Sequence, residues 1–316
     1  MSKPSIMYAG SDRFACQPLE RMIEAGYVPD VVLTNPDRRS GRGRKLTPTP
    51  VKALSQQHAI PTWTPLSIKD ENAFETFQSY NVDLFICVAY GKIIPTQWLE
   101  TVDAFNIHPS LLPKWRGCSP IEHTLLFRDT VAGVSIIEMT AKIDAGNILF
   151  QKQSHIDKED NTKTLGDRLF LEGSDLLIQT LQLWESNALP KPIDQDDSKV
   201  TFAPKISKQD ATIDWNKAAE EIHAMVKAYY DWPVANTLIN GEMLKIYLSD
   251  VRNCDIENSS PGQIIAIDDF GVWVTCRHGE LCIREGLIPG KRRMPIQEII
   301  KGRKDLFVVG EYFGAT

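Results

Sequence analysis

Two polar side chains that could support acid–base and oxyanion chemistry lie close together in the stretch 104–120, AFNIHPSLLPKWRGCSP: Asn106 and His108. If residues 104–108 end a strand, both side chains point to the same face of a sheet. A histidine can donate, accept or carry a proton near neutral pH, and an asparagine can donate to an oxygen without competing for that proton. The pair therefore predicts a site that stabilises a carbonyl oxygen as it becomes an oxyanion.

The residues that follow favour ligand binding by this pair. An Asn and a His at a strand end are often turn-forming or internally satisfied polar groups. Here they precede Ser-Leu-Leu-Pro (110–113) and Trp-Arg-Gly (115–117), which the sequence predicts to be an exposed loop with large apolar side chains. Loops of that composition usually bind something, so the loop supports a functional interpretation of the pair.

A carboxylate, Asp144, lies in the segment 140–146 (TAKIDAG), directly after a strand predicted over 133–139. A carboxylate in such a loop is most often a turn former. The presence of Asn106 and His108 elsewhere in the chain makes it a candidate: if it packs beside them, it could accept a proton.

The elements before this stretch indicate an α/β fold. The segments 5–9 and 28–34 read as strands, and a glycine turn and a helix over 14–25 lie between them, which is a Rossmann-type βαβ unit. The turn lacks G-x-G-x-x-G, so a dinucleotide site is excluded. The apolar run 82–90 predicts a central parallel strand, and its end at Tyr90 and Gly91 is expected to present backbone groups to a flat ligand.

Composition excludes several classes of protein. The 316 residues suffice for about two domains, and the formal net charge is −6. No apolar run approaches the roughly 18 residues of a membrane span, and the N-terminus has no secretory signal, so we expect a cytoplasmic protein without a membrane partner. The six cysteines form no C-x-x-C pair or metal spacing and read as free thiols: Cys16, Cys87, Cys118, Cys254, Cys276 and Cys282.

Two basic segments interrupt this acidic chain. Residues 36–52 and 291–304 each carry six Lys or Arg against one acid. A solvated charge run explains either segment alone, but together they suggest a localised anionic partner. Most of the first segment lies in 35–50, a Pro-, Gly- and Arg-rich stretch that predicts a long loop able to reach phosphates.

The second half of the chain changes character. A long amphipathic helix over 164–184 closes the first domain, and a Pro- and Asp-rich stretch predicts a linker over 188–208. Short strands with turn signals then alternate from residue 235 to 285, which suggests a small β-barrel, a common RNA-binding platform. We therefore expect domains at 1–187 and 209–316.

The stretch N-x-H-x-S-L-L-P-x-W-R-G, followed by Asp-Ala-Gly at 144–146, resembles the folate-dependent formyltransferases. Further matching stretches extend from residue 5 to the C-terminal region, among them VDLFICVAYGKIIP, FAPKI and KAYYDWPVA. The loop P-D-R-x-x-G-R-G-x-K-L-x-x-x-P-V-K is typical of members that act on initiator tRNA. The resemblance implies a Rossmann-like catalytic domain and an OB-like C-terminal barrel.

The resemblance also implies substrates and roles. These are 10-formyltetrahydrofolate as formyl donor, initiator methionyl-tRNA as acceptor, no metal, and a monomer that works in translation initiation. Asn106, His108 and Asp144 would be catalytic. The folate-contacting motif would be Ser110, Leu111, Leu112 and Pro113, with Tyr90 and Gly91 at the neighbouring strand end. Arg42 would contact the tRNA acceptor end, together with Arg38, Arg44 and Lys45.

Three alternatives are weighed against this expectation. A formyltransferase for an amino-sugar nucleotide could also carry a C-terminal barrel, but the basic loop 36–52 disfavours it. A non-catalytic RNA-binding protein would not need a polar trio. A purine-pathway formyltransferase leaves the roughly 110 residues after the linker unexplained. The segment Tyr230–Val234 departs from the family pattern, as does Pro109.

Overall fold

The protein divides into two compact units, each discontinuous in sequence. The computed structural model describes residues 3–40, 43, 45–252 and 260–314. Unit 1 comprises Met1–Pro120, Thr130–Ile156 and Gly166–Pro204, and unit 2 comprises Ile121–Asp129, Asp157–Leu165 and Lys205–Thr316. This division differs from the expected boundaries at 1–187, 188–208 and 209–316. The expected linker belongs to unit 1 as far as Pro204, because other segments of that unit bond its backbone, as in the mutual hydrogen bonds of Ile193 and Ile148.

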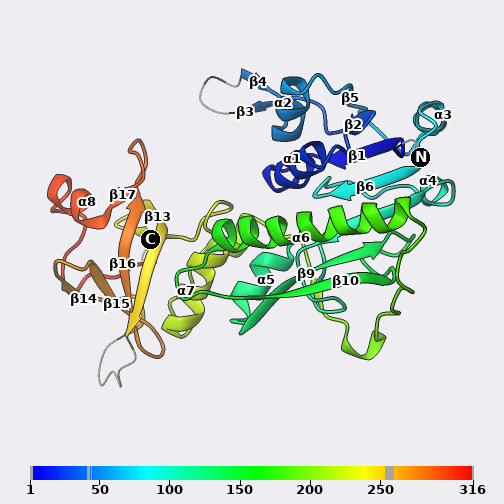
Figure 1. Cartoon of the computed structure of the whole chain (residues 1–316). Helices are drawn as coiled ribbons and strands as arrows, with labels where there is room; N and C mark the ends of the chain where they lie inside the picture. Colours follow the sequence, from blue (N-terminus) through cyan, green and yellow to red (C-terminus); the bar gives the residue numbers. More distant parts are fainter. Residues whose placement is uncertain (1–2, 41–42, 44, 253–259, 315–316) are drawn as a thin grey trace. The chain divides into compact units, whose positions relative to one another are not determined.

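Unit 1 is built on a seven-stranded sheet in the order β10-β9-β7-β6-β1-β2-β5 (Figure 1). Five strands (β7, β6, β1, β2 and β5) are joined by parallel pairing, and β9 lies antiparallel between β7 and β10. Strand β1 pairs with both β2 and β6, so the direction of winding reverses there, and ligands of open α/β sheets bind at such a switch point. The strands are β1 Ile6–Gly10, β2 Val31–Leu33, β5 Thr62–Trp63, β6 Leu84–Val88, β7 Asp103–His108, β9 Val131–Glu138 and β10 Ile148–His155.

The helices of unit 1 bury the apolar faces of this sheet. They are α1 Cys16–Glu24, α2 Pro50–Gln57, α3 Glu71–Ser79, α4 Thr96–Leu99 and, from Gly166 onward, α6 Thr162–Glu185, with short 3₁₀ turns at Arg13–Ala15 and Asp197–Lys199. On one face, Trp98 lies stacked on Phe77 and Trp63 and meets Phe85 of β6 edge-on. The fully buried strand β6 confirms the predicted central parallel strand.

Helix α6 lies alongside the sheet in unit 1 (Figure 1), and one glycine permits the close approach. A Cβ at Gly173 would lie 2.7 Å from Ile107 Cγ2 of β7 and 2.9 Å from Val134 Cγ2 of β9. Any larger side chain would push the helix off the two strands that carry and flank Asn106 and His108. The helix thus fixes the back of the strand on which the candidate chemistry lies.

Residues 35–50, predicted as a loop, contain a short hairpin instead. Strands β3 Arg38–Ser40 and β4 Lys45–Thr47 pair antiparallel. An isolated two-stranded ribbon is marginally stable, so its base needs anchoring. Lys52 Nζ donates to Asp37 Oδ1 at 2.7 Å, and Asn35 Nδ2 donates to the Tyr90 carbonyl at 2.9 Å. The Gly- and Pro-rich composition hid these short strands.

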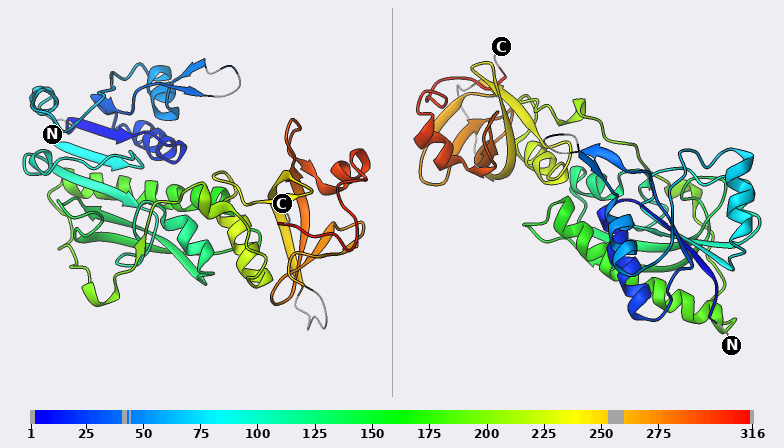
Figure 2. Two further views of the ribbon diagram at one scale, coloured as in Figure 1. Left: turned by 180° about the vertical axis from the view of Figure 1, so that it is seen from behind. Right: turned by 90° about the horizontal axis from the view of Figure 1, so that it is seen from above.

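Unit 2 contains the antiparallel OB-like sheet that the sequence predicts. Five strands pair in the order β12-β13-β16-β15-β14, and β17 pairs with β16. The strands of this sheet are coloured yellow to red in Figure 2. They are β12 Asn236–Ile239, β13 Glu242–Arg252, β14 Ile264–Ile267, β15 Val272–Thr275, β16 Glu280–Leu287 and β17 Met294–Pro295. Helix α7, Ala219–Ala228, packs on β13 and β16 through its buried residues, and α8, Ile296–Gly302, packs on β16.

Unit 2 also includes a helix from the first half of the sequence. Helix α5, Pro120–Leu126, belongs to unit 2 from Ile121 onward. A short 3₁₀ turn at Gln209–Ala211 also belongs to this unit. His123 of α5 is buried and stacks on Phe127. This inclusion follows from tertiary contacts between segments about 80 residues apart and has no counterpart in local sequence pattern.

Candidate active site

The three candidate catalytic side chains meet at the carboxyl end of β7 in unit 1. Asn106 Nδ2 lies 3.5 Å from Asp144 Oδ1, and His108 Nδ1 lies 3.5 Å from Asp144 Oδ2. The His108 side chain is 4% exposed and that of Asp144 14%. An amide, an imidazole and a carboxylate thus face one another in a largely dry environment, where charge interactions are stronger than in water.

The conformation of the Asp144 loop depends on the backbone at Asp144 and at Gly146. Asp144 has φ +50, a left-handed conformation that is uncommon for residues with a side chain, although Asp adopts it more readily than most. At Gly146, a Cβ would lie 1.8 Å from the Glu138 carbonyl at the end of β9, so only glycine fits there. The Asp-x-Gly pattern therefore has a structural reason: the turn must return tightly onto β9 to place Asp144.

Asp144 is further held by a backbone donor. The Gly117 N–H donates to Asp144 Oδ2 at 2.9 Å. Gly117 belongs to the short strand β8, Arg116–Gly117, which pairs with β11, Phe202–Ala203. The loop that follows Asn106 and His108 in sequence therefore also contacts the Asp144 carboxylate, through the Gly117 N–H.

The hydrogen bond of His108 defines its tautomer. Nε2 lies 2.9 Å from the Trp115 carbonyl oxygen. A carbonyl only accepts, so Nε2 carries a proton and Nδ1 faces the Asp144 carboxylate. A second proton on Nδ1 would make that nitrogen a donor, either to Asp144 or to an oxyanion next to it.

A thiol lies on the strand next to Asn106. Cys87 of β6 is the register partner of Asn106. Burial, with a smaller contribution from the Asp144 carboxylate, raises the pKa of Cys87 to about 12. The thiol is therefore neutral at physiological pH.

The loop 110–117 is more buried than its sequence suggests. Leu112 is 3% and Trp115 6% exposed, which corrects the expectation of exposed apolar side chains. Leu112 packs with Ile137 and Ile148. Leu111 packs against Gly133 of β9 so closely that a Cβ at Gly133 would lie 2.4 Å from Leu111 Cδ2. These apolar contacts anchor the loop to β9 and β10. Close packing of this kind holds the loop in one shape.

Polar contacts complete this anchoring. Ser135 Oγ donates to the Ser110 carbonyl at 2.6 Å and accepts from the Leu112 N–H at 3.2 Å. Gln151 Nε2 donates to the Leu112 carbonyl at 2.8 Å and to Ser135 Oγ at 2.9 Å. Pro113 is half-buried. The Ser-Leu-Leu-Pro segment is therefore a preshaped element at the edge of the site.

Tyr90 and Gly91 follow β6 at the same end of the sheet. The Tyr90 ring is 1% exposed, and its carbonyl accepts from Asn35 Nδ2 at 2.9 Å. Gly91 is exposed with φ +80, so its backbone is accessible. Of the two residues expected to meet a flat ligand, Gly91 is the one whose surface is open.

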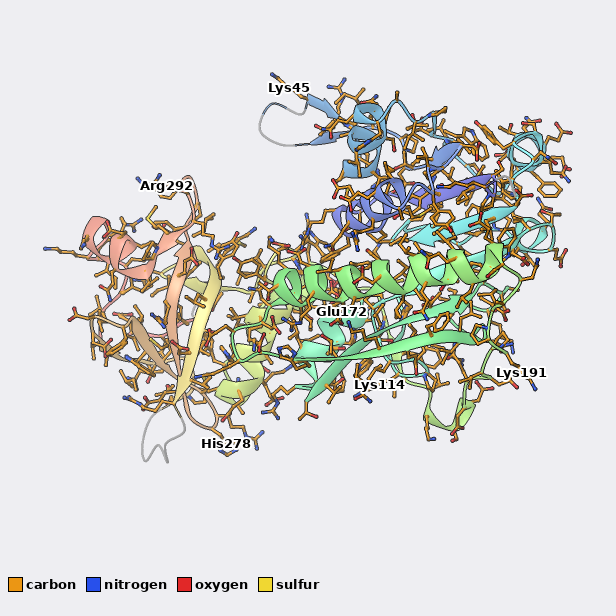
Figure 3. All side chains as sticks on the ribbon, in the orientation of Figure 1. Lys45, Lys114, Glu172, Lys191, His278 and Arg292 are labelled. Carbon is orange, nitrogen blue, oxygen red and sulfur yellow. The ribbon has the colours of Figure 1, made fainter. Side chains whose placement is uncertain are left out.

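The basic residues have differing placements. Arg38 and Lys45 are exposed on the hairpin, and Figure 3 shows Lys45 pointing away from the sheet of unit 1. Arg42 and Arg44 lie outside the described residues. In the second basic segment, three of the six cations form ion pairs: Arg293 with Glu285, Lys301 with Glu298, and Arg303 with Glu242 and Asp305.

Several residues that build the site were missed by sequence reasoning. Gln195 Nε2 donates to the carbonyls of Asp144 and Gly146, and Thr201 Oγ1 accepts from the Trp115 N–H at 2.9 Å. Both lie in the predicted linker. Their distance in sequence from the residues they hold left no local signal. Among the described residues, no three His, Cys, Asp or Glu side chains gather as metal ligands would, and no helix could span a membrane.

A parallel-sheet unit with this trio at its carboxyl edge, joined to an antiparallel unit, defines the class. The formyl transferase family model matches residues 14–181, and the model of the formyl transferase C-terminal domain matches residues 205–304. The chain belongs to the formyl transferase family. Relatives that match nearly the whole chain include several methionyl-tRNA formyltransferases.

Two of these relatives show the extent of the likeness. The methionyl-tRNA formyltransferase of Methylococcus capsulatus is 40% identical over 298 residues, 93% of this chain and 96% of its own. That of Hahella chejuensis is 34% identical over 319 residues, covering both chains fully. Similarity therefore extends through both units.

Solved structures share the fold at low identity. HypX from Aquifex aeolicus in complex with tetrahydrofolic acid matches with a TM-score of 0.63 and 15% identity over 100% of this chain and 51% of its own. An N-formyltransferase from Helicobacter canadensis, in complex with folinic acid and dTDP-3-aminofucose, matches with a TM-score of 0.65 and 18% identity, covering 89% and 98%.

Proposed function

We propose that this enzyme transfers the formyl group of 10-formyltetrahydrofolate to the α-amino group of initiator methionyl-tRNA. The single observation that carries the proposal is the convergence of Asn106, His108 and Asp144 at the end of β7. The full-length relatives named methionyl-tRNA formyltransferases support tRNA as the acceptor. The Rossmann-like fold alone would not, because one fold hosts many functions.

In the proposed reaction, the amine attacks the formyl carbon and a C–N bond forms. The electron pair of the carbonyl moves to its oxygen, where Asn106 Nδ2 and a protonated His108 Nδ1 donate to the oxyanion. Asp144 takes the proton that the amine loses. Collapse of the intermediate breaks the bond between the formyl carbon and N10, and Asp144 passes the proton it accepted to N10 as tetrahydrofolate leaves. The transfer is direct and requires no covalent enzyme intermediate.

The folate would occupy the edge of the site formed by two preshaped segments. We assign Ser110, Leu111, Leu112 and Pro113 together with Tyr90 and Gly91 to this role. The bonds from Ser135 and Gln151 hold the first segment before any ligand arrives. Such preorganisation reduces the entropy lost on binding.

The tRNA would meet the hairpin of unit 1. Exposed Arg38 and Lys45 on β3 and β4, with Arg42 and Arg44 between them in sequence, offer cations to phosphates of the acceptor stem. We further propose a monomer that works in the cytoplasm, where translation initiates. Light scattering of the purified protein tests the monomer.

A transfer assay tests the proposal. The protein is incubated with radiolabelled 10-formyltetrahydrofolate and, in separate reactions, with charged initiator tRNA, charged elongator methionyl-tRNA and dTDP-amino sugars. Formylation of initiator methionyl-tRNA with the highest kcat/KM is the expected result. Formylation of an amino sugar alone would refute tRNA as the acceptor and leave the proposed chemistry of the trio in place.

A further inference from the structure

We propose that Gln195 is a positioning residue for the reaction, because it fixes the backbone from which Asp144 reaches Asn106 and His108. The inference rests on the proposed catalytic role of Asp144. Gln195 Nε2 donates to the Asp144 carbonyl at 2.8 Å and to the Gly146 carbonyl at 2.7 Å. These two bonds span the turn that holds Asp144 at φ +50.

The orientation of the Gln195 amide is fixed by a third contact. Arg116 Nε donates to Gln195 Oε1 at 2.9 Å, and the Arg116 side chain is only 10% exposed. A flipped amide would place its oxygen against two carbonyl oxygens and its N–H groups against a guanidinium. One side chain therefore satisfies one donor and two acceptors at once, which only an amide of this length can do.

The three contacts close a ring around the carboxylate. Arg116 adjoins Gly117, whose N–H donates to Asp144 Oδ2 at 2.9 Å. The Gly117 N–H thus holds the side chain of Asp144, and Gln195 holds the main chain of the same residue. Gln195 also accepts from Arg116, so it connects the Asp144 turn to the 116–117 segment. Loss of Gln195 releases the turn at its base, so the carboxylate loses its fixed distance to His108 Nδ1.

The neighbouring segment reinforces the same arrangement. The Thr201 carbonyl accepts from the Arg116 N–H at 2.9 Å, and the Ala203 carbonyl accepts from the Cys118 N–H at 2.9 Å. These bonds hold the 116–118 loop, whereas Gln195 alone among the described residues 193–203 donates to the 144–146 turn. Gln195 therefore links the two loops through the main chain of the turn, in addition to the direct bond from Gly117 to the Asp144 carboxylate.

Steady-state kinetics of Gln195→Ala and Gln195→Glu test the inference. The second variant keeps size and the Arg116 contact, but it faces the two carbonyls with a charged oxygen. We expect kcat to fall roughly 10- to 100-fold in both, with KM for folate and tRNA changed by less than about 3-fold, because positioning is lost and substrate binding is not. Gln153, exposed on β10, supplies the matched controls Gln153→Ala and Gln153→Glu, which should retain wild-type kcat.

A double-mutant cycle with Asp144→Asn separates positioning from general destabilisation. If Gln195 acts through Asp144, adding Gln195→Ala to Asp144→Asn lowers the single-turnover rate by less than about 2-fold. A repeat of the full loss in that background would overturn the inference, as would wild-type kcat in both Gln195 variants. The wild type in the same assay distinguishes the two failures: an inactive wild type refutes the proposed function, and an active one with unaffected Gln195 variants refutes only the positioning role.

Discussion

Replacing Gly117 with alanine should slow catalysis by disturbing one hydrogen bond. Gly117 has φ +122, and a Cβ there would lie 2.6 Å from the Ala203 carbonyl oxygen, against at least 3.4 Å for an ordinary contact. The oxygen belongs to the backbone of β11 and cannot swing away. Relief requires the 116–118 loop to move by about 0.8 Å, which would stretch the 2.9 Å bond from Gly117 N to Asp144 Oδ2 beyond hydrogen-bonding distance.

The size of the effect follows from the charge on the acceptor. A hydrogen bond to a charged group contributes about 1.5–3 kcal/mol. If the whole of that is lost in the transition state, kcat falls roughly 10- to 150-fold at about 1.36 kcal/mol per decade. Single-turnover transfer from 10-formyltetrahydrofolate measures the change, and the thermal unfolding midpoint reports folding separately.

Gly241→Ala is the matched control for this substitution. Gly241, in the turn between β12 and β13, has φ +76 and nothing within 4 Å of an added Cβ. It shares the left-handed backbone cost of about 1–2 kcal/mol but has no steric contact, so its unfolding midpoint should drop while kcat stays at the wild-type value. A Gly117→Ala enzyme with wild-type kcat would show that the Gly117–Asp144 bond does not contribute to the reaction.

Three further outcomes are expected. Asn106→Ala, His108→Ala and Asp144→Asn each lower kcat by about 100-fold or more with an unchanged circular dichroism spectrum, and undiminished turnover of all three would exclude the proposed mechanism. Arg38→Ala and Lys45→Ala should each raise KM for tRNA and leave KM for folate unchanged. Each should also reduce the slope of log tRNA affinity against log salt concentration by about 1, and the sequence predicts the same for Arg42→Ala. An equal rise of KM for folate would contradict this assignment. Because burial raises the pKa of Cys87 to about 12 from 9.0, the unfolded chain releases this proton first, so its stabilising effect is complete below pH 9.0 and is lost as pH rises toward about 12. Urea unfolding at pH 7 and 10 should therefore show a smaller loss of stability in Cys87→Ala than in the wild type, and an equal loss would argue against this assignment.

Local pattern was sufficient where the information is local. The alternation of a strand places Asn106 and His108 on one face, and a continuous apolar run identifies β6, because both depend on neighbouring residues and on burial. The alternating strands of the second half likewise predict the antiparallel sheet of unit 2. The motif resemblance then supplied the chemical interpretation of these residues.

Other features depend on segments that are distant in sequence. Asp144 reaches Asn106 across 38 residues, and Gln195 reaches Asp144 across 51. The segment containing Gln195 looked like a linker because its backbone bonds to other loops and needs no periodic pattern of its own. The membership of α5 in unit 2 likewise depends on tertiary contacts with distant segments, which its own residues do not signal.

The sequence by itself thus determined the kinds of element, the fold class and the polar groups available for chemistry. Only the tertiary structure decided which of these groups meet, which nitrogen of His108 faces Asp144, and which side chain holds the Asp144 turn. Periodicity and turn composition are encoded in adjacent residues, whereas contacts across a fold are set by the joint packing of many segments, which no single stretch specifies.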